Sequence, residues 1–248
     1  MNEKEVVLTK PQILLEMEQQ LRNWESSADR KAVFLGCYAM MTHNMHDAVE
    51  AGEFNDGEWV RQLLLRFARY YFDALECYEK EADAARQVWR IAHDAAAESD
   101  ITPLQLLLLG VNAHINYDLV LALDDVLAEE WPRLDPEART KRHADYCHVN
   151  DIIARTIDAV QDAILNPAMP IMETVDTLMG RLDEMLISSL LTRWRDEVWQ
   201  SALRVLEPPD GEQREAVRRE VEVRVLDRAD MLAIRDWRKL EFLLSHAM

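Results

Sequence analysis

The chain has 248 residues, of which 49% are hydrophobic and 30% charged, a composition that argues against intrinsic disorder. Glycine is scarce, with 6 residues, whereas Leu, Ala, Glu and Arg are abundant, which favours helices. The formal net charge of −18 argues against nucleic acid and anionic membrane surfaces as partners, because both attract clustered Lys and Arg.

Several features of the sequence predict a cytoplasmic protein. The N-terminal stretch MNEKEVVLTK lacks the basic start and apolar core of a signal peptide. No stretch reaches about 18 uninterrupted apolar residues, so we expect no membrane span. Cys37, Cys77 and Cys147 are odd in number and widely spaced, which suits free thiols in a reducing compartment.

Helical periodicity runs through the first part of the chain, and local start and stop residues divide it into segments. Thr9 is an expected N-cap, Gly52 an expected C-terminal residue, and Asp56 the expected start of a third helix. These residues predict helices over 10–25, 29–51, from 56 onward, and around 84–97.

The second part of the chain begins with a strong helix start at Thr102-Pro103, where threonine can cap and proline is tolerated at the first helical position. This central helix is expected to run to about Glu130, before Trp131-Pro132. Further helices are predicted from 135 to 165, over 170–206 as one helix or two broken near Gly180, and over most of 212–246.

No segment alternates convincingly with a period of two residues, which is the pattern of a half-buried strand. The sequence therefore predicts an all-α fold. We expect a single domain over 1–248, a bundle of about seven to nine helices. The first nine residues, 1–9, are expected to be a flexible N-terminus.

The central helix contains polar side chains where a buried helix should have none. Within LLLLGVNAHINYDLVLAL, Asn112, His114, Asn116 and Asp118 are surrounded by Leu and Val. Burying such groups without partners costs roughly 2–7 kcal/mol each, so each must bond to a neighbour, to water or to a ligand. The sequence therefore predicts a site at this point of the chain.

Helical geometry divides these polar residues into two stripes. His114 and Asp118 share one face with Asp125 and Glu129, and two other residues, Asn112 and Asn116, lie on another face nearly opposite. One stripe is expected to face a cavity, and the other to bond to neighbouring helices. The alternative is that both stripes only bond to neighbours and fix the register of the helix.

Two other helices carry side chains that could complete a metal site with His114 and Asp118. His43 and Asp47, in the helix predicted over 29–51, repeat the same i,i+4 spacing. Asp145 lies in the segment RHADYCHVND of the helix predicted from 135 to 165. Helical bundles build metal sites from side chains on facing helices. The predicted metal ligands are therefore these five residues, and the cofactor would be a divalent metal ion of unknown identity.

Cys147 offers a different chemistry, because His143 and His148 lie within one helical turn of it and an imidazolium favours the thiolate form. No third residue can be assigned to orient such a pair. A thiol nucleophile is therefore a weaker alternative to a site on the central helix.

A further alternative depends on the segment from Asp124 and Asp125 to Glu129. It resembles the aspartate-rich motif with which class I terpene synthases hold Mg²⁺ on a prenyl diphosphate. Asn150 and Asp158 loosely match the second metal motif of those enzymes, but alanine occupies the intervening hydroxyl position. The resemblance implies a Mg-dependent, terpene-cyclase-like enzyme with one metal ligand missing.

The octet NAHINYDL, Asn112–Leu119, resembles the hallmark of a bacterial family, domain-of-unknown-function family 5995. Weaker matches extend the resemblance over about 35–235, among them Asp145, Asn150 and the pair Trp194-Arg195. The resemblance implies a single helical domain in which the four polar residues of the octet form the defining cluster. It implies no reaction, cofactor or substrate.

The leading hypothesis from the sequence is a small-molecule enzyme whose polar pocket is centred on His114 and Asp118. His114 would serve as metal ligand or general acid–base, Asp118 as co-ligand or orienting group, and Asn112 and Asn116 as positioning residues. The competing hypothesis is a non-catalytic helical binding or scaffold protein. A small-molecule ligand is the expected partner, and the sequence leaves open whether the chain forms a homo-oligomer.

Overall fold

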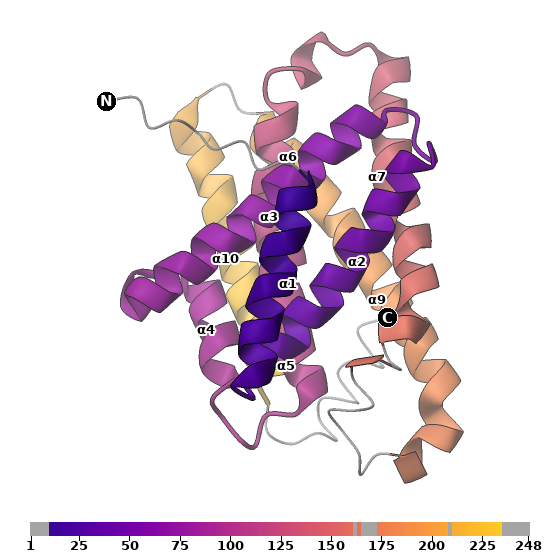
Figure 1. Ribbon diagram of the computed structural model, residues 1–248. Helices are drawn as coiled ribbons and strands as arrows, with labels where there is room; N and C mark the ends of the chain where they lie inside the picture. Colours follow the sequence, from indigo (N-terminus) through magenta and orange to yellow (C-terminus); the bar gives the residue numbers. More distant parts are fainter. Residues whose placement is uncertain (1–9, 161–162, 165–172, 208–209, 235–248) are drawn as a thin grey trace.

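The computed structural model describes residues 10–160, 163–164, 173–207 and 210–234, and all regular elements within these ranges are helical (Figure 1). The α-helices are α1 (Lys10–Ser26), α2 (Ala32–Glu50), α3 (Gly57–Lys80), α4 (Gln87–Ala95), α5 (Pro103–Ala113), α6 (Leu119–Leu127), α7 (Pro136–Val160), α9 (Glu173–Leu206) and α10 (Gly211–Leu232). Shorter turns are η1 (Ala82–Ala84), η2 (His114–Asp118) and η3 (Trp131–Arg133). The predicted all-α multi-helix fold is confirmed.

The helix starts that the sequence predicted follow from local hydrogen bonds. The Asp56 carboxylate accepts the backbone N–H of Trp59 at 3.0 Å, and Thr102 and Gln105 form a reciprocal capping box at the start of α5. Gly52 follows the end of α2 with a φ of +73°, a left-handed conformation that glycine adopts without strain. The predicted cap Thr9 and the predicted flexible segment 1–9 lie outside the described residues.

The structure settles the extent of two predicted helices in the C-terminal part of the chain. The segment expected as one helix or two broken near Gly180 is the single helix α9. The last predicted helix, 212–246, corresponds to α10, which ends at Leu232, and residues 235–248 lie outside the described part of the chain.

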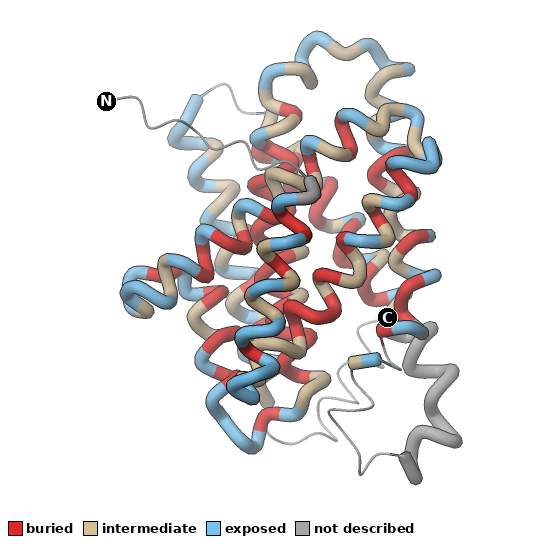
Figure 2. The backbone as a smooth tube through the Cα atoms, in the orientation of Figure 1, coloured by how far each residue is buried: buried red, intermediate tan, exposed pale blue. Residues whose placement is uncertain are grey.

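The centre of the fold is a continuous rod made of α5, η2 and α6. It contacts α2, α3, α4, α9 and α10, and Figure 2 shows buried backbone concentrated along the middle of the assembly. By length and composition Pro103–Leu127 could cross a membrane, but 89% of its most apolar window is buried inside the protein, as in the core helix of a bundle. Its apolar character is therefore explained by contact with the surrounding helices.

The rod is interrupted at its middle by η2, a π-helical segment. In a π-helix the backbone hydrogen bonds span five residues instead of four, so one extra residue fits into the turn. Apart from Asn112, every polar residue of the octet lies in η2. These residues are His114, Asn116, Tyr117 and Asp118, and all four are buried. Single π turns inside α-helices occur often at functional sites.

Gly110 permits the closest approach between the rod and α2. A Cβ atom at this position would lie 2.4 Å from Cδ2 of Phe34 and 2.9 Å from its Cβ. The ring of Phe34 therefore occupies the space that any larger residue would need. This close packing brings α2 against the rod immediately before the π segment.

Candidate functional site

His114, the first residue of η2, is enclosed by aromatic rings. Its imidazole stacks on the ring of Phe67 with centroids 3.6 Å apart and planes 6° apart, and Tyr38 meets it edge-on at 4.3 Å. The side chain is 3% exposed. Because a ring of α3 stacks on the imidazole and rings of α2 meet it edge-on, its orientation is fixed by packing.

Asp118 orients the same imidazole from the other end of η2. His114 Nδ1 lies 3.3 Å from Asp118 Oδ2, and the indole Nε1–H of Trp89 donates to that oxygen at 2.9 Å. Since Oδ2 accepts from Trp89, we assign the hydrogen on the imidazole to Nδ1, which makes Oδ2 the acceptor of two bonds. The lone pair of the neutral imidazole is then on Nε2.

Burial moves the pKa of both members of this pair toward their neutral forms. Desolvation lowers the pKa of His114 well below its ordinary value. Desolvation also raises the pKa of Asp118 well above its ordinary value, opposed by the Trp89 hydrogen bond and the nearby charge of Arg86. Among the described residues, His114 Nε2 and Asp118 Oδ1 have no hydrogen-bond partner although both atoms are buried.

A cavity of about 160 Å³ lies beside His114, which forms part of its wall. An apolar cavity of about 150 Å³ is large enough to hold benzene. Four helices supply most of the apolar wall: Phe34, Met41 and Met45 from α2, Val60, Leu63, Leu64 and Phe67 from α3, Val149, Ile153 and Ile157 from α7, and Leu191 from α9. The space beside the imidazole is therefore suited to a small, mostly apolar molecule.

Few charged or hydrogen-bonding side chains interrupt this apolar wall. Apart from His114, they include Thr42, Asp145 and Arg195, and all three are buried. The Thr42 hydroxyl donates to the carbonyl of Tyr38 at 2.8 Å within its own helix. The two charged groups, Asp145 and Arg195, have different sets of partners.

Asp145 holds the loop between α2 and α3. Its Oδ1 accepts the backbone N–H and the side-chain amide of Asn55, each at 2.8 Å, and its Oδ2 accepts the backbone N–H of Asp56 at 2.9 Å. Both oxygens are therefore engaged with the protein. This carboxylate fixes the start of α3, which carries Phe67 and much of the cavity wall.

The five predicted metal ligands are not gathered into one cluster. His43 is exposed and pairs with Glu18 at 3.2 Å, Asp47 is 82% exposed, and Asp145 bonds to the α2–α3 loop. Within the described residues, no group of three or more His, Cys, Asp or Glu side chains could hold a metal ion. The i,i+4 spacing of His43 and Asp47 places them on an outer face of α2, so spacing alone was misleading.

Asn112 and Asn116 are absent from the cavity wall and join the rod to α10. Asn112 Nδ2 donates to the carbonyl of Val225 at 2.9 Å, and Asn116 Nδ2 donates to Asn112 Oδ1 at 2.9 Å. His114 lines the cavity, whereas Asp118, on the same predicted stripe, bonds to Trp89 of α4, and Asn112 bonds to α10. In the structure the two amides link the rod to α10.

The acidic residues that resemble a diphosphate-binding motif are paired with arginines on two different helices. Asp124 accepts from Arg218 of α10 at 2.5 Å, whereas Asp125 accepts from Arg66 of α3 at 2.6 Å. Glu129 is exposed. Asn150 Oδ1 accepts from Arg195 Nε at 2.6 Å, and nothing is described of the Asp158 side chain. In the structure Asp124 and Asp125 are therefore each engaged with an arginine of a neighbouring helix.

Cys147 lies 3.4 Å from His143 Nε2 but is not an activated thiol. Burial raises its pKa, and the charge of Asp196 raises it further. A raised pKa disfavours the thiolate, which is the nucleophilic form. The arrangement therefore gives no support to the thiol alternative.

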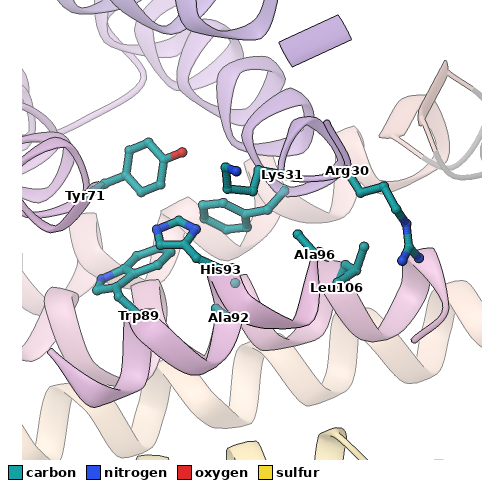
Figure 3. A pocket seen from close by; sticks show the side chains of 10 residues that line it. Arg30, Lys31, Tyr71, Trp89, Ala92, His93, Ala96 and Leu106 are labelled. Carbon is teal, nitrogen blue, oxygen red and sulfur yellow. The ribbon is translucent and has the colours of Figure 1, made fainter. Parts of the chain in front are cut away.

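A second, much smaller hollow of about 20 Å³ lies on the other side of Phe34, between α2, α4 and α5 (Figure 3). It has room for about one water molecule. Figure 3 shows His93 beside Trp89 on α4, and their rings stack at 5.2 Å. Burial lowers the pKa of His93 to about 3, and the charge of Lys31 contributes to this shift. The hollow is too small for an organic ligand.

Three residues of the site were not assigned to it from the sequence. Phe67, Trp89 and Tyr38 had no role in the site predicted from the sequence. Trp89 is 29 residues from Asp118 in the sequence, and only the packing of α4 against α5 brings the two together. A single sequence contains no local pattern that announces such a contact.

Comparison with known proteins identifies the family and no closer relative. No curated protein and no solved structure matches this chain. Residues 11–234 match a family of unknown function, DUF5995, which agrees with the resemblance of the octet Asn112–Leu119. Because the match covers most of its length, this chain belongs to the DUF5995 family.

Proposed function

We propose that this protein is a small-molecule enzyme that binds a small, mostly apolar molecule in the cavity beside His114, and that His114 exchanges a proton with it. One observation carries the proposal. A buried imidazole, held by Phe67 and oriented by Asp118, forms part of an apolar cavity wall while its Nε2 has no partner among the described residues.

The chemistry expected of this arrangement is general acid–base catalysis. A neutral imidazole with its lone pair on Nε2 can accept a proton from a bound molecule, and the Asp118 carboxyl group at Nδ1, in its ionised form, would then stabilise the imidazolium. Burial favours the neutral, proton-accepting form of His114 before reaction. Asp118, which accepts a hydrogen bond from Trp89, would orient the ring and, when ionised, stabilise the positive charge that forms on it.

The competing function is a non-catalytic binding or scaffold protein in which the polar cluster only fixes helix register. That hypothesis requires no space beside His114, whereas a cavity of about 160 Å³ adjoins it. The cavity therefore supports the proposal over this alternative.

Binding of phenol and toluene, measured by isothermal titration calorimetry, tests the proposal. The two molecules have nearly the same shape, but only phenol can donate a hydrogen bond to Nε2. We expect both to bind, and phenol to bind about five- to tenfold more tightly, which corresponds to one hydrogen bond of about 1 kcal/mol. His114→Phe keeps an aromatic ring against Phe67 and should abolish the preference for phenol.

A matched pair of tryptophan variants locates the binding. Val149→Trp adds volume at the cavity wall and should prevent binding of both probes, whereas Val223→Trp, at a residue of α10 that is 58% exposed, should leave it unchanged. If neither phenol nor toluene binds saturably, the proposed function is wrong. If both bind but His114→Phe keeps the preference for phenol, His114 has no direct role.

A further inference from the structure

We propose that the molecule held in this cavity is an anion, a small carboxylic acid with an apolar body, and that Arg195 binds its carboxylate. This inference rests on the proposed function, because it assigns a chemical class to the occupant of the same cavity. The observation behind it is a buried guanidinium in an apolar wall that lacks a carboxylate partner among the described residues.

Arg195 is built into the wall by neutral groups. It is 4% exposed, its Nε donates to Asn150 Oδ1 at 2.6 Å, and its Nη2 donates to the carbonyl of Tyr146 at 2.8 Å. The hydroxyl of Tyr146 donates in return to the carbonyl of Arg195 at 2.7 Å. The guanidinium also lies over the Tyr146 ring, 4.3 Å from its centroid. Its position is therefore fixed from several sides.

The charge of this guanidinium is not neutralised by an ion pair with any described residue. Most buried arginines pair with carboxylates, because an isolated buried charge is costly. Arg228, which is also largely covered, pairs with Glu197 at 2.9 Å. Asp145 lines the same cavity, but its oxygens bond to Asn55 and Asp56 and do not form an ion pair with Arg195.

The guanidinium also keeps hydrogen-bonding capacity for a ligand. Arginine has five N–H donors, and the bonds of Arg195 to described residues use Nε and Nη2, which leaves Nη1 without a protein acceptor among them. A carboxylate at Nη1 would accept a charge-assisted hydrogen bond and supply the missing negative charge. A phosphate would bring two charges and a larger hydration shell into this wall, so a monocarboxylate fits better.

The size of the cavity and the positions of Arg195 and His114 in its wall limit the rest of the molecule. About 160 Å³ accommodates one aromatic ring or a short aliphatic chain. Arg195 belongs to α9 and His114 to the central rod, and both line the same cavity. The carboxylate would lie at Arg195, and the apolar body would extend among Phe67, Leu63 and Ile153.

The test compares each acid with its neutral amide. Benzoate and benzamide, phenylacetate and phenylacetamide, and hexanoate and hexanamide are titrated into the full-length protein by calorimetry at pH 7 and constant salt. Within at least one pair we expect the acid to bind at least tenfold more tightly. Arg195→Met should reduce this preference to within about twofold, and Arg195→Lys, which keeps the charge, should retain part of it. Arg204→Met, at an exposed arginine of the same helix, should leave it unchanged.

The possible outcomes separate this inference from the proposed function. If amides bind as tightly as acids to the wild-type protein, the carboxylate assignment is wrong, although the apolar cavity still binds ligands. If acids and amides both fail to bind while phenol or toluene binds, only the inference is wrong, and if none of these molecules binds, the proposed function is wrong as well. The comparison within the wild-type protein remains decisive even if Arg195→Met does not fold, which circular dichroism would reveal.

Discussion

The indole N–H of Trp89 and the carboxylate of Asp118 form a buried hydrogen bond of 2.9 Å that joins α4 to the last residue of the π segment. Both side chains are almost completely covered, at 0% and 1% exposure. Through this bond the orientation of His114 depends on a helix that does not itself line the cavity. The bond therefore links the stability of the fold to the geometry of the site.

Substituting the two buried tryptophans separately should reveal this link. Trp89→Phe removes the donor to Asp118, whereas Trp59→Phe removes an indole Nε1 that has no partner among the described residues. We expect Trp89→Phe to lower the free energy of unfolding by about 1–3 kcal/mol more than Trp59→Phe, because it removes one of the two buried hydrogen bonds to Asp118 Oδ2. Urea denaturation of both variants measures the difference. Equal losses would mean that the Trp89 hydrogen bond adds nothing.

Gly110→Ala should destabilise the protein by steric overlap with Phe34. The added Cβ would lie 2.4 Å from the ring, so α2 or the ring must shift, at a cost of about 1–3 kcal/mol. Gly211→Ala is the matched control, because nothing lies within 4 Å of the Cβ it would add. The double variant Gly110→Ala with Phe34→Leu should lose less than the sum of the single losses. If the losses in the free energy of unfolding are additive, Phe34 is not the residue with which the added Cβ clashes.

Asp145→Asn should destabilise the α2–α3 loop without any involvement of a metal. The variant replaces one oxygen that faces backbone donors with an amide, and hydrogen bonds to a charged group contribute about 1.5–3 kcal/mol each. Asp151→Asn, at an exposed position of the same helix, should change the free energy of unfolding by less than about 0.5 kcal/mol. A wild-type melting temperature that falls on addition of a chelator would argue for a metal role.

Stability should fall as the pH is lowered below neutrality, because His93 is buried in its neutral form. Burial lowers its pKa from 6.5 to about 3, so between these values the unfolded chain binds a proton that the folded protein does not. This term therefore favours folding above pH 6.5 and is lost as the pH falls toward 3. Its slope is at most about 1.4 kcal/mol per pH unit.

Urea titrations at several pH values between neutrality and pH 4 test this dependence. His93→Gln should flatten the curve relative to the wild type, since glutamine does not titrate. His43→Gln, at an exposed histidine, should keep the wild-type slope. Burial also lowers the pKa of His114, which acts in the same direction as His93, whereas the raised pKa of Asp118 acts in the opposite direction. An unchanged slope in His93→Gln would contradict the assignment.

The parts of the fold that were predictable from the sequence depend on local chemistry. Asp56 and Thr102 mark helix starts, because a cap depends only on residues within one turn. The octet indicates a candidate site, because its polar side chains interrupt a leucine-rich helix. The separation of His114 from Asn112 onto different faces follows from helix geometry alone. Residues that are close together in the sequence are sufficient to predict these features.

The remaining features depend on contacts between distant segments. The stacking of Phe67 on His114 and the cover that Tyr146 gives to Arg195 arise only when the helices pack. The predicted metal ligands illustrate the opposite case. His43 and Asp47 have the spacing of a ligand pair, but an acidic, exposed helix face produces that spacing without function. Spacing identifies candidates, and burial decides among them.

The π turn at His114–Asp118 has a consequence for how the central rod tolerates changes of length. A π turn holds one residue more than a regular turn, and the wider turn absorbs that residue locally. Deleting one residue of the turn would therefore restore a regular helix and leave Leu119–Leu127 against its present neighbours on α3 and α9, whereas a deletion elsewhere in the rod would rotate all following side chains by roughly 100°. The π segment is thus the place where the rod can lose a residue without repacking its second half, and such a loss would alter the geometry of His114 and Asp118 alone.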